Sequence, residues 1–195
     1  MQGKTLIGLD LAGKEENPTG LAALTGKRVY ASIIYTNKEI LEKVLSIKPK
    51  IVAIDAPLKP PKEGFLRKAD RELIKMGYRV FPPAFPGMKA LTLRATNLNK
   101  LITEKGLKTI EVHPASTRKA LGMPWKNWRD VQKIFEKMGL EGSLKERNLT
   151  AHEIDALTAA LTAHLYLKGL AETLGDEGEG LVVIPKMQNW RCLKL

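Results

Sequence analysis

The sequence has 195 residues, of which 44% are hydrophobic and 27% charged, and this suits one globular domain with a substantial core. Its single cysteine, Cys192, excludes an intramolecular disulfide and a zinc site built from several cysteines. The net charge of +11 is compatible with a phosphate-bearing partner such as nucleic acid, although lysine-rich surfaces also serve ion-pair networks in heat-adapted proteins.

No segment of the sequence predicts targeting or membrane insertion. The first apolar run, residues 5–10, is too short for a secretory signal and lacks a small-residue cleavage site. No apolar stretch reaches the length that spans a bilayer. We therefore expect a cytoplasmic protein with no membrane partner. The sequence leaves the oligomeric state open, a dimer included.

Strands dominate the first part of the predicted fold. Residues 4–11, 20–24 and 29–35 are rich in apolar and β-forming residues. The segment 25–27 between the second and third has the composition of a hairpin turn. Three consecutive strands with short links predict an antiparallel meander.

After these strands the pattern changes to helices that alternate with strands. Apolar residues at helical spacing predict a helix over residues 38–47, and the apolar run 51–54 predicts a buried strand parallel to an earlier one. Residues 65–76 and 88–105 predict two helices on either side of a proline-rich loop, residues 81–87.

The last part of the chain predicts one more clear strand, over residues 109–113, and its strongest helix. The remaining predicted elements are helices over residues 115–121, 128–138 and 151–170, a flexible acidic link over 175–180 and a short apolar run over 181–184 that could add a strand.

This order of elements predicts an α/β fold with a mixed five-stranded sheet, in which three antiparallel strands precede parallel strands and helices cover both faces. We place this domain at residues 1–175, with a helical insertion at about residues 60–108. Residues 176–195 are treated as a C-terminal tail.

Four acidic residues are expected near one edge of this sheet. Asp10 and Asp55 end the first and fourth strands, and ligands of open α/β sheets bind beyond the carboxyl ends of parallel strands. Glu111 lies within the fifth strand, and Asp155 lies in the first turns of the last long helix. Local alternatives stay open, because the first two could form turns, Glu111 could pair with a basic residue, and Asp155 could favour the helix N-terminus.

Carboxylates brought this close repel one another unless they share a proton or bind a cation, and hard oxygen ligands suit Mg²⁺ or Mn²⁺. We predict that Asp10 bridges two ions about 4 Å apart, that Asp55 and Asp155 hold one each, and that Glu111 joins or supports the ligands. His152 precedes Asp155 by one helical turn and would orient water or bind a metal. Such a site would hydrolyse phosphodiester bonds in structured DNA or RNA.

Five segments, taken in order, resemble the domain-of-unknown-function 429 family, whose members are described as predicted nucleases with a ribonuclease-H-like fold. They are residues 8–12 (Gly-Leu-Asp-Leu-Ala), 54–58 (Ile-Asp-Ala-Pro-Leu), Arg67 with Asp70, 111–114 (Glu-Val-His-Pro) and 152–157 (His-Glu-Ile-Asp-Ala-Leu). The resemblance runs from about residue 4 to residue 170.

The resemblance implies a ribonuclease-H-like sheet and a metal site made by Asp10, Asp55 and Asp155. It also marks Arg67, Asp70 and the loop at residues 82–83 as pocket edges, although the spacing of Arg67 and Asp70 alone would predict an ion pair on a helix surface.

Two features complete the predicted site. We expect substrate contacts from Arg67, Asp70, Lys14 and Arg118. Enzymes of this architecture often carry paired acids in the last helix, and this chain has His152 with Asp155 there, a pattern closer to junction resolvases than to ribonuclease H. Glu153 has the spacing of a helix cap with Thr150 and is the weaker candidate.

Two other functions compete with the nuclease. A nucleotide-binding phosphotransferase of the actin and sugar-kinase type shares the sheet order and the acid on the first strand. It normally needs two such domains, and residues 9–13 offer only one weak loop. A non-catalytic nucleic-acid binder would use the basic surface and Trp125, Trp128 and Trp190.

Overall fold

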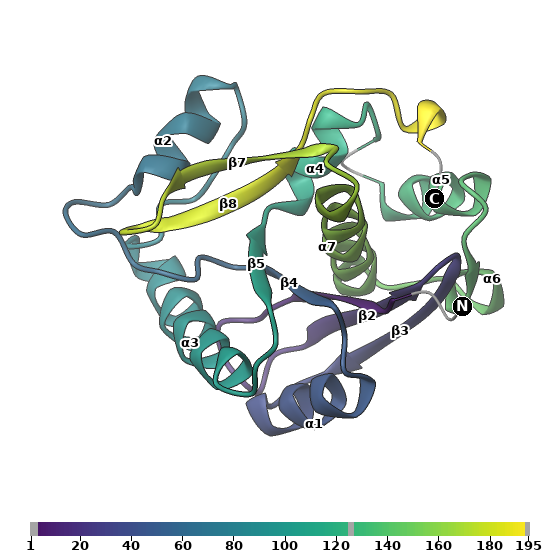
Figure 1. The fold of residues 1–195 in the computed structure, drawn as a ribbon, viewed down its shortest axis with the longest axis horizontal. Helices are drawn as coiled ribbons and strands as arrows, with labels where there is room; N and C mark the ends of the chain where they lie inside the picture. Colours follow the sequence, from purple (N-terminus) through teal and green to yellow (C-terminus); the bar gives the residue numbers. More distant parts are fainter. Residues whose placement is uncertain (1–3, 125–126, 194–195) are drawn as a thin grey trace.

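The computed structural model describes residues 4–124 and 127–193, which form one mixed sheet with helices on both faces (Figure 1). The strands are β1 (Leu6–Asp10), β2 (Thr19–Thr25), β3 (Arg28–Ile34), β4 (Ile51–Asp55), β5 (Thr109–Val112), β6 (Glu141–Gly142), β7 (Ala171–Asp176) and β8 (Gly180–Pro185). The α-helices are α1 (Asn37–Ile47), α2 (Lys68–Lys75), α3 (Pro86–Thr103), α4 (Pro114–Ala120), α5 (Trp128–Lys137), α6 (Ser143–Glu146) and α7 (Ala151–Leu167), and a 3-10 turn covers Trp190–Cys192.

The predicted fold class is confirmed. The sheet has the order β6-β3-β2-β1-β4-β5-β8-β7 in the described residues, with β1, β2 and β3 antiparallel and β4 and β5 parallel to β1. The five expected strands form its centre. The sheet is nevertheless wider than predicted, because β6 adds to the β3 edge and the β7–β8 hairpin adds beside β5.

The β7–β8 hairpin replaces the expected flexible link. The carboxylate of Asp176 accepts hydrogen bonds from the backbone N–H groups of Gly178 (2.9 Å) and Glu179 (3.0 Å), which fixes the turn. β8 then runs parallel to β5 and pairs with it at Glu111 and Val112. The expected tail boundary at residue 176 therefore falls inside a hairpin of the sheet.

The two faces of the sheet carry different side chains. Ile7 and Leu9 of β1 pack with α1 and α3, whereas Leu6 packs towards α7 together with Ile51 and Ala53 of β4. Side chains alternate along a strand, so Asp10 of β1 and the last residue of β4 also face α7. The ends of both strands therefore lie on the α7 face of the sheet.

Helix α7 lies directly on the backbone of the sheet because two glycines allow it. A Cβ added to Gly8 of β1 would overlap the carbonyl oxygen of Ala156, and one added to Gly20 of β2 would overlap that of His152. Glycine within a strand often marks such a close approach. The contact at Gly20 brings the first turn of α7, with His152, against the carboxyl end of β1.

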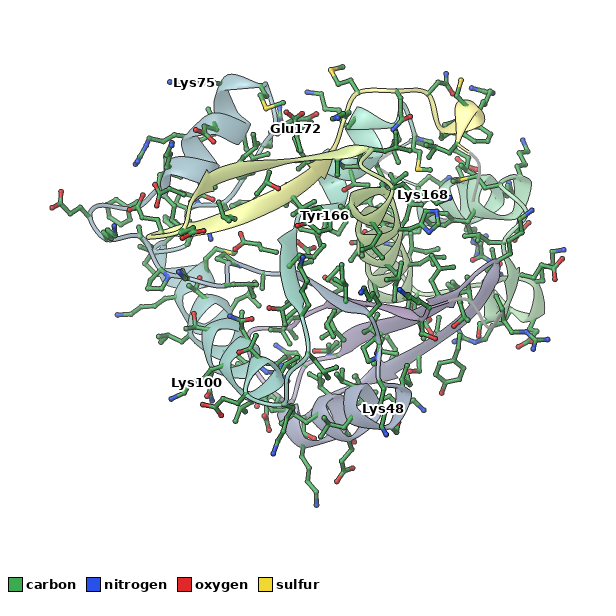
Figure 2. All side chains as sticks on the ribbon, viewed as in Figure 1. Lys48, Lys75, Lys100, Tyr166, Lys168 and Glu172 are labelled. Carbon is green, nitrogen blue, oxygen red and sulfur yellow. The ribbon has the colours of Figure 1, made fainter. Side chains whose placement is uncertain are left out.

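Basic side chains are spread over the surface. Figure 2 shows Lys48, Lys75, Lys100 and Lys168, which are exposed and come from the ends of α1, α2, α3 and α7. Within the described ranges, no helix has both the length and the apolar character needed to cross a membrane. The cytoplasmic location stays a prediction.

Candidate metal and catalytic site

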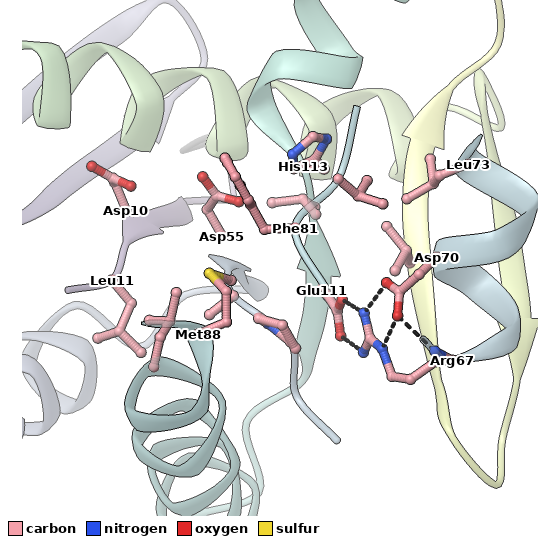
Figure 3. A pocket seen from close by; sticks show the side chains of 16 residues that line it. Asp10, Leu11, Asp55, Arg67, Asp70, Leu73, Phe81, Met88, Glu111 and His113 are labelled. Atoms are coloured by element: carbon pink, nitrogen blue, oxygen red, sulfur yellow. Dashed lines mark hydrogen bonds and ion pairs between the residues drawn. The ribbon is translucent and has the colours of Figure 1, made fainter. Parts of the chain in front are cut away.

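Asp10 and Asp55 form the centre of the candidate site. They are register partners on the adjacent parallel strands β1 and β4, each is the last residue of its strand, and both line one pocket (Figure 3). The sequence placed these two acids at one sheet edge, and the structure brings them together there.

Burial and repulsion from neighbouring carboxylates disfavour the charged form of both acids. Burial raises the pKa of Asp10 to about 6, with a further contribution from the charge of Asp155, against the hydrogen bond to His152, which lowers it. Burial, followed by repulsion from Asp10 and then Asp155, raises the pKa of Asp55 well above its usual value. A cation at this place would relieve the repulsion.

Two of the acids at the site have a partner from another element. The Nδ1 atom of His152 lies 2.6 Å from Oδ2 of Asp10, so the first turn of α7 is hydrogen-bonded to the end of β1. Asp155, one turn later in α7, forms an ion pair with Nη1 of Arg118 from α4. The substrate contact expected of Arg118 stays a prediction, and its guanidinium is held by this carboxylate.

Glu111, which was expected to join or support the metal ligands, belongs to a different hydrogen-bond network. In the register of β4 and β5 it pairs with Ile54 and not with Asp55, so its side chain lies on the opposite face from Asp55. Arg67 donates to both of its oxygens, from Nη1 (2.8 Å) and Nη2 (2.6 Å), and the N–H of Leu58 donates to Oε2 (2.8 Å).

The ion pair of Arg67 and Asp70 is a core feature, and the helix-surface pair that their spacing alone predicted is wrong. Arg67 donates to Asp70 from Nε (3.0 Å) and Nη2 (2.8 Å), and the two side chains are 1% and 4% exposed. Burial alone would lower the pKa of Arg67, but the bonds to Glu111 and Asp70 outweigh it and raise that pKa. The network joins α2 to β5, and all three guanidinium nitrogens of the charged Arg67 side chain donate hydrogen bonds within it.

The pocket beside Asp10 and Asp55 has a volume of about 200 Å³, and most of its other lining residues are apolar. Phe81 belongs to this lining and is 75% exposed. The side chains that line the pocket come from Asp10, Leu11, Asp55, Ala56, Pro57, Arg67, Asp70, Leu73, Val80, Phe81, Met88, Leu91, Glu111, Val112, His113 and Val182. The family resemblance marked the loop at residues 82–83 as a pocket edge, and its neighbour Phe81 lines the pocket, whereas the apolar lining was not predicted.

Other candidates lie away from this pocket. Lys14 is exposed and lies 3.8 Å from Glu16, and it is not among the described residues that line the pocket. Glu153 completes a capping box with Thr150 and pairs with Arg147, so its role is structural.

The tryptophans proposed for nucleic-acid stacking do not form an exposed platform in the described part of the chain. Trp190 is buried and Trp128 packs against the same core cluster under α7. Trp125 lies outside the described residues.

The donor chemistry fits a hard cation, but only partly as predicted. Carboxylate oxygens are the ligands that Mg²⁺ and Mn²⁺ prefer. Across residues 4–124 and 127–193, no group of three or more His, Cys, Asp or Glu side chains is placed to hold one ion. Asp55 has no hydrogen-bond or ion-pair partner among these residues, whereas Asp10 and Asp155 do. Two carboxylates together with bound water would fit such an ion. The predicted three-ligand site of Asp10, Asp55 and Asp155 stays a prediction.

No family model matches the sequence, and no curated protein matches it, so membership of the domain-of-unknown-function 429 family stays a prediction. Among solved structures, the chain is similar to Thermus thermophilus RuvC, with a TM-score of 0.51 and 17% identity over 85% of this chain and 96% of that one. T. thermophilus RuvC in complex with Holliday junction substrate also matches, with a TM-score of 0.49 and 18% identity over 85% of this chain and 96% of that one. The first of these likenesses, together with the sheet order, shows that the chain has a ribonuclease-H-like fold.

Proposed function

We propose that this protein is a divalent-metal-dependent nuclease that hydrolyses phosphodiester bonds in structured DNA or RNA, with Mg²⁺ or Mn²⁺ as its cofactor. The observation that supports it is the pair formed by Asp10 and Asp55. They end adjacent parallel strands, line one pocket, and have raised pKa values, while Asp55 lacks a partner in the described residues. Perturbed acids in a cleft at the carboxyl ends of strands are typical of functional sites.

In this proposal each residue of the centre has a distinct task. Asp10 and Asp55 would hold the cation, which when bound supplies a Lewis acid for the negative charge that develops on the phosphate. His152 fixes the orientation of the Asp10 carboxylate through its 2.6 Å hydrogen bond. Arg118 holds the Asp155 carboxylate in place from the neighbouring helix α4.

The remainder of the pocket suits a nucleotide next to the cleaved bond. Phe81 lines the same pocket as the acids with an exposed aromatic ring, and aromatic rings stack on bases of any sequence. The lysines of Figure 2 lie on several sides of the molecule, so they would attract a polyanion from many directions. Recognition would therefore depend on the pocket more than on one basic patch.

A cleavage assay tests the proposal. Labelled four-way junction, flap, hairpin, duplex and single-stranded substrates are incubated with Mg²⁺, with Mn²⁺ or with EDTA. We expect cleavage of at least one substrate only with a metal, and a loss of at least about 1000-fold in Asp55→Asn. Asp130→Asn, which removes a half-exposed acid paired with Lys133, is the matched control and should keep full activity. Metal-independent cleavage, or full activity of Asp55→Asn, would contradict the proposal.

A non-catalytic nucleic-acid binder is the second candidate. Two observations favour it. Asp155 is already paired with Arg118, and the described residues contain no group of three or more His, Cys, Asp or Glu side chains placed to hold one metal ion. The same substrates separate the two functions, because a binder retains them without cleavage under every metal condition.

A further inference from the structure

Arg118 is a buried cation at the edge of an acidic centre. Its side chain is 6% exposed, and Nη1 contacts the carboxylate of Asp155 and lies 3.4 Å from Oγ1 of Thr158. Its Nε atom is buried and has no acceptor among the described residues. Asp155 is therefore the charged partner that makes the burial of this guanidinium tolerable.

The position of Arg118 is fixed by its own helix. Thr117, its neighbour in α4, is buried and hydrogen-bonded through Oγ1 to Oγ1 of Thr162 in α7 (2.8 Å). The N–H of Met123 donates to the carbonyl of Arg118 at 2.8 Å, which closes the end of α4. Withdrawing the guanidinium would leave a buried charge unpaired, so Asp155 is not free to take up another ion.

The charge balance agrees with this geometry. The carboxylates of Asp10, Asp55 and Asp155 carry three negative charges when ionised, and Arg118 offsets one of them. Two negative charges are then left, and one divalent cation balances them.

The pocket identifies which acids are left for that cation. Asp10 and Asp55 line it, while Asp155 and Arg118 are not among the described residues that do. The side chain that lacks a partner, Asp55, thus faces the pocket, and the acid with the arginine partner does not.

We propose that the centre binds a single divalent cation, held by Asp10 and Asp55, and that Arg118 takes the place of a second metal ion by neutralising Asp155. This inference rests on the proposed function and changes the two-ion arrangement expected from the sequence. Arg118 thereby acts as a positioning residue that sets the number of metal ions.

Metal stoichiometry measured on the intact protein tests the inference without reference to activity. Mn²⁺ is titrated into the metal-free protein while electron paramagnetic resonance reports both the free ion and the spectrum of the bound ion. We expect one bound Mn²⁺ per chain with the spectrum of an isolated ion, and its loss in Asp55→Asn. Two bound ions with the exchange-coupled spectrum of a pair about 4 Å apart would overturn the single-ion inference and leave the proposed function standing. No bound Mn²⁺ at all would overturn both.

Two matched variants test the role of the arginine. Arg118→Gln leaves Asp155 as an unpaired carboxylate, so we expect a second Mn²⁺ to bind, or the first to bind at least about tenfold more tightly. Arg147→Gln removes the other arginine paired with an acid of α7, Glu153, and should leave stoichiometry and affinity unchanged. Equal Mn²⁺ binding by wild type and a folded Arg118→Gln would contradict the inference. The wild-type titration decides the stoichiometry even where Arg118→Gln does not fold.

Discussion

Replacing Asp10 by Asn should stabilise the metal-free protein at neutral pH. Asp10 is 18% exposed, and its pKa is raised from 3.8 to about 6, mainly by burial. Each pKa unit corresponds to about 1.4 kcal/mol, so the ionised carboxylate opposes folding by up to about 3 kcal/mol. Asn resembles the protonated acid in shape and polarity and does not acquire this charge.

The pH dependence has a definite sign. Because the folded-state pKa is the higher one, the favourable contribution of protonated Asp10 is complete below about pH 4 and is lost as the pH rises through about 6. The difference in unfolding free energy between variant and wild type should therefore be small at pH 4. It should grow to between about 1 and 3 kcal/mol at pH 8.

Urea unfolding in EDTA at both pH values measures this difference. Asp130→Asn is the control, because that half-exposed acid pairs only with Lys133 in the described residues and should show no such gain. Adding Mg²⁺ should reduce the gap, since a bound cation stabilises the wild type by mass action. A variant that is less stable than wild type at pH 8, or a gap that does not change with pH, would refute the reasoning.

Three other changes test the surroundings of the site. Gly8→Ala should lower the unfolding free energy by about 3 kcal/mol, because its methyl group overlaps the backbone of α7, whereas Gly87→Ala meets no neighbour and should be neutral or stabilising in the same urea titration. Arg67→Met should cost about 3 to 5 kcal/mol in unfolding free energy, since it leaves two buried carboxylates unpaired, and a loss below 1 kcal/mol would show that they find other partners. Phe81→Ala should weaken binding of a labelled substrate about tenfold in EDTA, measured by fluorescence anisotropy, without changing stability. Phe85→Ala, in the same loop but outside the pocket lining, should bind as wild type, and equal losses in both variants would argue against stacking in the pocket.

The centre of the sheet was predictable because its signals are local. The apolar run that ends at Asp55 specifies a buried strand, and the position of the acid at its end follows from the register with β1. The face on which Glu111 lies was also predictable from the sequence. Side chains alternate along a strand, so Glu111 lies on the opposite face from its neighbours Ile110 and Val112. Its separation from Asp55 followed only once the register of β4 and β5 was known.

The features that could not be predicted from the sequence depend on contacts between residues far apart in the chain. Arg118 is one of 32 basic residues, and nothing near it in the sequence indicates that its partner lies 37 positions away on α7. A strand at residues 181–184 was expected, but β7 and its pairing with β8 into a hairpin were missed for a similar reason. Its glycine-rich turn has the composition of a flexible link, and only the side chain of Asp176 and the pairing of β8 with β5 make it a sheet element.

Burial of an acid does not by itself identify a functional residue in this protein. Glu111 is buried, yet Arg67 and the N–H of Leu58 satisfy its oxygens, so it stabilises the joint between β5 and α2. Asp55 sits one strand away without a partner in the described residues, beside a second carboxylate, and the fold retains the repulsion that results. A residue kept in that state reduces stability, and functional sites are where such a loss is commonly found. Asp55 is accordingly the residue whose substitution discriminates best between a structural and a catalytic role for this edge of the sheet.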